Sequence, residues 1–225
     1  MGKFITSFIF LVMLCTLAAC KPLPSAILQE ELCSPPCWKG ITPGITLVQE
    51  LNEKLESFPE IDAKSIKAMY VLQPNDSIDF KFLPNMRREE GGRIYLESGV
   101  VRAISLSPKS NLLLLPEVLQ KWGPPDQYIS IYYSKAETPY LTTSVVYTKQ
   151  GIILVNIRNM RSDEIPRFDS GFPILSVWYT NPASITILLE NGLIDTISPQ
   201  DILDGLKPWN GLGEIYYINK NLSGR

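Results

Sequence analysis

The sequence has no histidine among its 225 residues. This absence excludes Ser-His-Asp and Cys-His catalytic machinery, a histidine proton shuttle and a histidine-rich metal centre. A glycine-rich phosphate loop is also missing, because Gly91-Gly92 has neither the required spacing nor a following helix. We therefore expect no nucleotide chemistry, no metal site and no organic cofactor.

The sequence also lacks a marked excess of charge of one sign, since 21 basic and 23 acidic residues give a formal net charge of -2. The basic pair Arg87-Arg88 is followed at once by Glu89-Glu90, so no stripe of positive potential forms that could displace counterions from phosphates. The sequence therefore does not predict a nucleic-acid partner.

The N-terminus carries the strongest pattern in the chain. An almost unbroken apolar stretch, residues 4–17, follows Lys3 and ends at Ala18-Ala19. A positive start, an apolar segment and small residues at its end are typical of a cleaved secretory signal peptide, here residues 1–19. The stretch is too short for a comfortable transmembrane helix.

The residues Leu17-Ala18-Ala19-Cys20 resemble the lipobox of bacterial lipoproteins. The resemblance implies that the thiol of Cys20 carries lipid, such as palmitate, and that the signal is cut off just before it. The mature protein is then expected at the cell membrane or outer membrane, on the extracytoplasmic face of the cell envelope. An ordinary secretory signal and an uncleaved anchor are the alternatives.

Cysteine is rare, with four residues, and its use fits export. Cys15 leaves with the signal and Cys20 is assigned to lipid, so Cys33 and Cys37 remain, in the segment Cys-Ser-Pro-Pro-Cys. In an oxidising compartment two nearby thiols favour a local disulfide. A redox dithiol lacks the Cys-x-x-Cys spacing, and a zinc site would need carboxylates as further ligands.

The first part of the mature chain predicts a tether followed by a helix and strands. Residues 20–37 form the lipidated cysteine and a tether, and folding is expected to begin near Trp38. Thr46 and Gln49 predict a capping box at the start of an amphipathic helix that ends at Pro59. Antiparallel strands are then expected at residues 68–72, 77–82, 93–97 and 100–106.

The pattern of residues 47–55 is repeated at residues 114–122, which share apolar positions, a glutamate and a lysine. Pro116 suits the first turn of this second helix, and Gly123-Pro124-Pro125 predicts its end. Strands are expected to follow at residues 128–133, 144–148 and 152–157.

We therefore expect an α+β fold with two layers, built from two helix-plus-antiparallel-meander units, residues 38–106 and 107–160. Residues 161–225 are expected to form a C-terminal extension packed on the second unit. Its predicted elements are strands at 174–179, 185–189, 193–197 and 213–219, and a helix that starts at Ser198-Pro199-Gln200-Asp201.

This arrangement is similar to that of small lipoproteins of the SmpA/BamE type, which assist the assembly of outer-membrane barrels. The resemblance lies in residues 41–46, Ile-Thr-Pro-Gly-Ile-Thr, and in residues 119–125. It implies a two-layer α+β module, and only the fold is carried over. The opening residues 36–44 also resemble those of uncharacterised lipoproteins from filamentous green bacteria, which imply no activity.

Carboxylates are the remaining candidates for chemistry. Glycoside cleavage needs two acidic groups at a set distance across a sugar, and the sequence offers five candidates: Asp79, Glu97, Asp126, Glu190 and Asp195. Most lie at predicted turns or exposed strand positions, where solvation explains them as well.

Aromatic residues could instead line a sugar or peptide groove, or pack in the core. The candidates are Trp38, Trp122, Trp178, Trp209, Tyr132-Tyr133 and Tyr216-Tyr217. Adjacent residues of a strand point to opposite faces, so we expect at least one tyrosine of each pair to be exposed.

The function expected from these observations is a lipid-anchored binding or scaffolding module at the cell envelope, with an envelope protein or a glycan as partner and no enzymatic activity. A glycan-directed envelope hydrolase that uses paired carboxylates is the alternative, and a purely structural envelope component is a third. A concave site with two facing carboxylates would favour the enzyme, and an aromatic or edge-strand surface would favour the binder.

Overall fold

The computed structural model describes residues 25–28, 33–69, 76–85, 89–109, 112–185, 202 and 204–220. The described helices are α2 (Val48–Ser57), α3 (Leu115–Trp122) and three short 3-10 turns, η1 (Ala26–Leu28), η2 (Ala63–Ser65) and η3 (Pro182–Ser184). The described strands are β1 (Lys67–Met69), β2 (Ser77–Lys81), β3 (Glu89–Glu97), β4 (Val100–Pro108), β5 (Gln127–Tyr133), β6 (Tyr140–Tyr147), β7 (Ile152–Asn159), β8 (Arg167–Phe168), β9 (Ser176–Thr180), β10 (Lys207–Pro208), β11 (Gly213–Glu214) and β12 (Ile218–Lys220).

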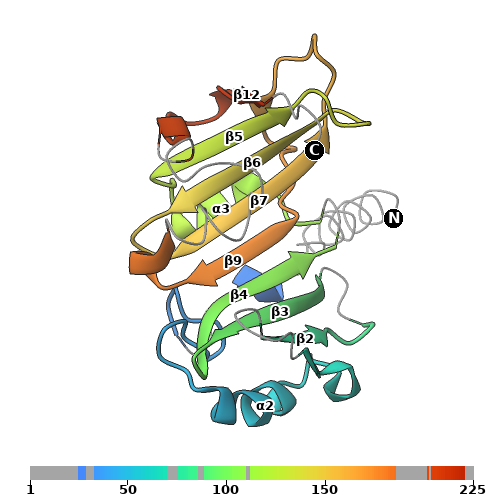
Figure 1. Cartoon of the computed structure of the whole chain (residues 1–225), viewed down its shortest axis with the longest axis vertical. Helices are drawn as coiled ribbons and strands as arrows, with labels where there is room; N and C mark the ends of the chain where they lie inside the picture. Colours follow the sequence, from blue (N-terminus) through green and yellow to red (C-terminus); the bar gives the residue numbers. More distant parts are fainter. Residues whose placement is uncertain are drawn as a thin grey trace, which may run out of the picture.

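Ten of these strands form one twisted sheet, and β8 pairs with β11 beside it. The sheet order is β1-β2-β3-β4-β9-β7-β6-β5-β10, and β12 pairs with β5 in the only parallel pairing among the described strands (Figure 1). The expected α+β class is confirmed in its coarse form, a mostly β structure with an antiparallel sheet and two short helices.

The two meanders meet at the centre of the sheet, where β4 pairs with β9. Ala103 to Leu106 of β4 lie opposite Val177 to Thr180 of β9, and β9 pairs with β7 on its other side. We call the β4·β9 pairing the seam. A strand from the predicted C-terminal extension therefore joins the two predicted units, because β9 supplies hydrogen bonds to both of them.

The predicted first capping box is wrong. Helix α2 begins at Val48 after Leu47, which makes no side-chain capping bond, and the hydroxyl of Thr46 accepts a hydrogen bond from the Thr42 amide instead. The second helix begins at Leu115, and the Glu117 carboxylate accepts from the Leu114 amide. Gly123 ends it with a φ of 77°, a conformation that favours glycine.

The predicted strand at residues 213–219 is divided in the structure. β11 pairs with β8, whereas β12 pairs with β5, and the buried side chain of Ile215 lies between them. One strand cannot pair with two separate sheets without a bend, so the chain leaves strand geometry at residues 215–217. The predicted strand at 193–197 and the predicted helix start at Ser198 lie outside the described residues.

One face of the sheet is covered by helices. Leu106, Leu154 and Val177 belong to its apolar cluster, together with Leu51 and Leu55 of α2 and Val118 of α3. Helix α3 lies behind β6 and β7 in Figure 1. We call this side the helix-covered face; it contains the largest buried cluster described in the molecule.

The opposite face has two different halves. Over β5, β6, β7 and β9 it is apolar, and Ile185, Ile202 and Leu206 of the C-terminal region pack against it. Over β2, β3 and β4 it carries mostly polar side chains. Alternation along the strands produces this contrast, since residues two apart share a face.

The predicted tether is partly packed into the folded domain. Ser25 and Ile27 are each 1% exposed, and the Tyr179 hydroxyl donates a 2.8 Å hydrogen bond to the Ile27 carbonyl oxygen. The two prolines nearby are typical of a tether, but the apolar side chains of Ile27 and Leu28 fill a gap beside the seam. Folding thus begins before Trp38.

Candidate functional site

The polar half of the open face forms a regular grid of side chains. Strand register places Lys67, Asp79, Arg93, Ser105 and Trp178 in one row across five strands. A second row contains Lys81, Gly91 and Ser107, and Tyr95 lies in a third, opposite Ser77 and Ala103. We call the surface made by Lys67, Asp79, Lys81, Arg93, Tyr95, Ser105 and Ser107 the polar sheet face.

This surface is hollowed into a pocket of about 790 Å³. Its rim is completed by four residues that precede or follow the strands or lie at their ends: Asp62, Lys64, Ser65 and Glu90. A volume of this size falls within the range of small-ligand sites in proteins, roughly 300–1,000 Å³. The hollow is wide and shallow, so it suits a ligand that lies along the surface.

Gly91 keeps the middle of the second row free of a side chain. A Cβ built there would lie 2.5 Å from the Phe80 carbonyl oxygen, closer than such atoms approach in proteins. Its neighbour Gly92 faces the core, and the Phe80 ring occupies the space that a Gly92 side chain would need. The glycine pair is therefore required by packing and leaves the floor of the hollow open.

Asp79 and Arg93 form a bidentate ion pair on the polar sheet face. The Arg93 Nε and Nη2 groups donate hydrogen bonds of 2.6 and 2.8 Å to the two oxygens of Asp79. These bonds, more than the charge itself, raise the pKa of Arg93 above its ordinary value. A fork of this kind fixes the orientation of both groups.

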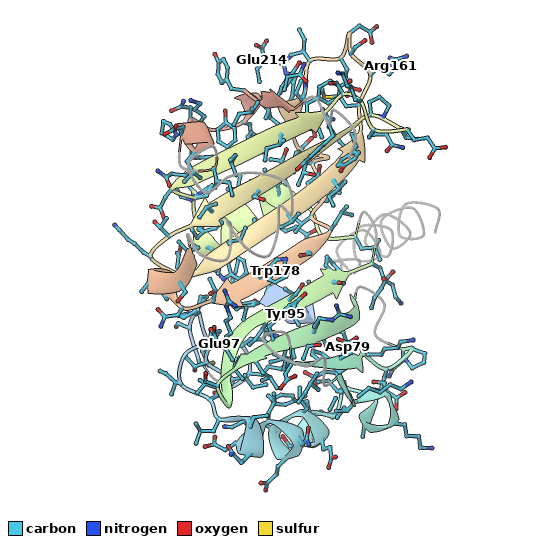
Figure 2. The ribbon with its side chains drawn as sticks, in the orientation of Figure 1. Asp79, Tyr95, Glu97, Arg161, Trp178 and Glu214 are labelled. Carbon is cyan, nitrogen blue, oxygen red and sulfur yellow. A yellow bond between two sulfur atoms is a disulfide. The ribbon has the colours of Figure 1, made fainter. Side chains whose placement is uncertain are left out.

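The Tyr95 and Trp178 rings stack above β4, at the boundary between the polar and apolar halves. Their centroids are 5.2 Å apart and their planes differ by 19°. Small residues on β4, Ala103 and Ser105, lie between β3 and β9 and leave room for the two rings to meet. Figure 2 shows both residues near the centre of the sheet, with Asp79 toward the lower right.

Burial of this stack has electrostatic consequences. Desolvation raises the pKa of the Tyr95 phenol, so it stays protonated and can donate or accept a hydrogen bond at neutral pH. Trp178 is 8% exposed, and its buried indole N–H has no hydrogen-bond partner. Tyr95 lines the hollow, and its stack with Trp178 places an aromatic surface at that edge.

Cations outnumber anions on the strands of this surface. Lys67, Lys81 and Arg93 face Asp79, while the rim adds Lys64 together with Asp62 and Glu90, so the lining of the hollow holds four cations and three carboxylates. The whole chain has a net charge of -2, so this local excess runs against the overall charge. The polar sheet face therefore attracts ligands that carry negative charge.

The sequence-predicted carboxylates do not come together in the part of the chain that the structure describes. Asp79 binds Arg93. A Glu97 carboxylate oxygen lies 3.6 Å from the Nε of Arg102. Asp126 accepts hydrogen bonds from the amide and the hydroxyl of Thr148. None of these three forms a pair with another of them. Glu190 and Asp195 lie outside the described residues.

The aromatic candidates mostly belong to the core. Trp38 is buried, and Trp122 and Trp209 pack against the same cluster. Both Tyr132 and Tyr133 are buried, so the prediction that one of them is exposed is wrong, because the sheet is covered on both faces at β5. The second pair meets the expectation, since Tyr216 is 70% and Tyr217 38% exposed.

Sequence reasoning did not find the polar sheet face. Its signal is present in the alternation Asp79-Phe80-Lys81 and Arg93-Ile94-Tyr95, with polar residues on one side and apolar residues on the other. That pattern predicts a half-exposed strand but does not show which strands lie side by side. The juxtaposition of these residues depends on the register of β1 to β4 and on β9.

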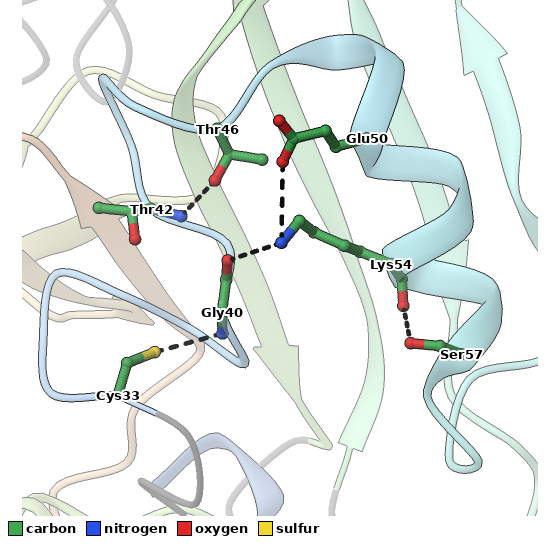
Figure 3. Close-up of polar contacts among 7 residues, drawn as sticks. All are labelled: Cys33, Gly40, Thr42, Thr46, Glu50, Lys54 and Ser57. Atoms are coloured by element: carbon green, nitrogen blue, oxygen red, sulfur yellow. Dashed lines mark hydrogen bonds and ion pairs between the residues drawn. The ribbon is translucent and has the colours of Figure 1, made fainter.

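Cys33 and Cys37 form a disulfide with a Cα separation of 5.7 Å. The Gly40 amide donates to the Cys33 sulfur, and Lys54 of α2 contacts both the Gly40 carbonyl oxygen and Glu50 (Figure 3). The disulfide loop is thus attached to the first helix. Immediately after it, Trp38 enters the core, stacked on Phe80.

Removing this disulfide is expected to lower the free energy of unfolding by about 2 kcal/mol, the loop-closure value for a short loop. Cys33→Ser with Cys37→Ser should show this loss in urea denaturation followed by tryptophan fluorescence. An unchanged midpoint would show that contacts with α2 hold the loop without the disulfide. Adding reductant to the wild-type protein should give the same loss and serves as the matched control.

Cys20 lies outside the described residues, so its predicted lipidation stays a prediction. Among the residues that the structure does describe, no helix is long and apolar enough to cross a membrane. The same portion contains no group of three or more cysteine, aspartate or glutamate residues that could hold a metal ion.

Comparison with models of known protein families, with curated proteins and with solved structures finds no match for this chain. The resemblance to SmpA/BamE-type lipoproteins therefore has no support beyond the residues on which it was based. Function must be argued from the geometry of the chain itself.

Proposed function

We propose that this chain is a lipid-anchored binding module on the extracytoplasmic side of the cell envelope, and that it binds its ligand on the polar sheet face. The observation that carries the proposal is the open hollow of about 790 Å³ over β2, β3 and β4. A bidentate ion pair, Asp79 with Arg93, and the ring stack of Tyr95 on Trp178 organise this face.

The composition of the hollow favours binding over catalysis. Both carboxylate oxygens of Asp79 accept hydrogen bonds from Arg93, so this group is already engaged within the surface. Glycoside cleavage requires a protonated acid and a second carboxylate across the sugar. The other carboxylates that line the hollow, Asp62 and Glu90, lie on its rim, and this arrangement supports the binding module over the hydrolase.

The charges indicate the chemistry of the ligand. Lys67, Lys81 and Arg93 would accept an anionic group, while Ser105 and Ser107 can form hydrogen bonds with hydroxyl or amide groups. The Lys67 and Lys81 side chains are exposed and have no ion-pair partner among the described residues. We therefore infer a hydrophilic ligand that carries negative charge.

The architecture supports a scaffolding role for the remainder of the chain. We infer that α2 with β1 to β4 and α3 with β5 to β7 are related units, because each helix precedes an antiparallel meander in the same order. Joining the units through β9 produces one wide sheet, of which only part carries the polar sheet face.

Photocrosslinking in intact cells tests the proposed function. A photoreactive amino acid at Ser107, on the polar sheet face, should give a specific adduct that mass spectrometry identifies. The same photoreactive residue in a Lys67→Glu, Lys81→Glu double variant should give at least about tenfold less adduct. Two contacts from exposed cations to the anionic ligand are lost there and are replaced by repulsion.

The matched control carries the same change of charge elsewhere. Lys149 and Lys207 are exposed and lie in the β6–β7 turn and in β10, away from the polar sheet face, so Lys149→Glu with Lys207→Glu should leave the adduct unchanged. Equal loss in both double variants would indicate a nonspecific charge effect and would contradict the proposal.

A further inference from the structure

The N-terminal segment is attached to the side of the sheet opposite the polar sheet face. Ile27 and Leu28 belong to the apolar cluster of the helix-covered face, and Tyr179, which bonds the Ile27 carbonyl oxygen, points to that same face. In Figure 1 the blue turn η1 lies behind β4 and β9. The segment is held beside the seam, near the middle of the sheet.

Only a short length of chain separates this attachment from the predicted lipid anchor. Between Cys20 and the buried Ser25 are the four residues 21–24. Five Cα-to-Cα steps span at most about 18 Å when fully extended. Ser25 must therefore remain within about that distance of the lipid-bearing residue.

This reach is too short to bring the polar sheet face onto the same membrane. A chain that starts on the helix-covered face must cross the thickness of the sheet layer, about 10 Å, to reach the other side. It must also pass an end or an edge of the sheet. The nine residues of β4 give a half-length of about 15 Å, and the three strand spacings between β4 and β1 give a similar lateral distance. Either route adds about 15 Å to the layer thickness of about 10 Å, and the total exceeds the reach of about 18 Å between Cys20 and Ser25.

We propose that the membrane that holds the anchor lies on the helix-covered side, so that the polar sheet face is directed to the aqueous compartment. This inference rests on the proposed lipid anchoring and deepens the proposed binding function. The cations of the polar sheet face could otherwise bind anionic headgroups of their own membrane. The short attachment excludes that source, so the negatively charged ligand comes from the aqueous compartment.

Fluorescence quenching in vesicles tests this orientation. The full-length lipidated protein, purified from membranes, is reconstituted into vesicles of phosphatidylcholine with or without phosphatidylglycerol and with headgroup nitroxide lipids. A fluorophore is attached at Lys81→Cys on the polar sheet face, or at Gln120→Cys on the exposed side of α3. Maleimide coupling leaves the Cys33–Cys37 disulfide unmodified.

Quenching is expected to be at least about twofold weaker at position 81 than at position 120, since about 10 Å of sheet layer separates the two sides. Adding phosphatidylglycerol should not reverse this order. Equal or stronger quenching at position 81, in either kind of vesicle, overturns the proposed orientation. Protein that does not sediment with the vesicles overturns the anchoring itself. Failure to obtain an adduct at Ser107 in the crosslinking experiment, with the expected quenching order in vesicles, overturns the binding function but not the orientation.

Discussion

Cys20→Ser is expected to release the protein from the membrane almost completely. Each buried methylene of an acyl chain contributes about 0.8 kcal/mol of membrane affinity, and stable anchoring needs more than one chain. No helix in the described part of the chain can replace that anchor. Fractionation of cells should move the protein from the membrane pellet to the soluble extracytoplasmic fraction.

Cys15→Ser is the matched control for this release. Cys15 lies in the apolar stretch of the predicted signal peptide, five residues before Cys20, so its loss should leave membrane retention unchanged. A Cys20→Ser protein that stays in the pellet would contradict lipid anchoring and would favour an uncleaved N-terminal anchor. Mass spectrometry of the mature N-terminus separates these two results.

Trp38→Ala is expected to lower the free energy of unfolding by about 3–5 kcal/mol, the usual cost of removing a large buried aromatic side chain. Trp38 is 2% exposed, stacks on Phe80 at 5.6 Å, and meets the edges of Phe58 and Phe82. Phe80 lies between Asp79 and Lys81, so the resulting cavity also loosens the strand that carries the polar sheet face. Urea denaturation followed by circular dichroism measures the loss.

Trp38→Phe is the control that distinguishes packing from polar contacts. The indole N–H of Trp38 is buried without a hydrogen-bond partner, so a phenyl ring should retain most of the stability. An equally large loss in both variants would indicate that the full indole volume is required. A small loss in Trp38→Ala would contradict the assignment of Trp38 to the core.

Local patterns predicted the elements that depend on neighbouring residues. The second helix follows from the apolar spacing of residues 114–122, Pro116 and the Gly123 stop, and the structure confirms it at Leu115–Trp122. Apolar runs with intervening turns likewise predicted β3 to β7. In each case backbone hydrogen bonds and side-chain alternation over a few residues determine the outcome.

Long-range contacts decided the places where prediction failed. Ile27 and Leu28 resemble part of a tether, and only the gap beside Tyr179 explains why they are buried. Both Tyr132 and Tyr133 are buried because each face of β5 is covered by a segment distant in sequence. The alternation of polar and apolar residues along β5 does not show which distant segments cover its two faces.

The candidate site shows the same division. The sequence by itself predicts an export signal and a lipobox at Cys20, locates the strands that carry Asp79, Lys81 and Arg93, and excludes histidine chemistry. Only the tertiary structure decided that β9 joins the two meanders and brings Trp178 over β4 to Tyr95. Strand pairing between residues more than seventy positions apart depends on the burial of both strands together, which no local pattern encodes.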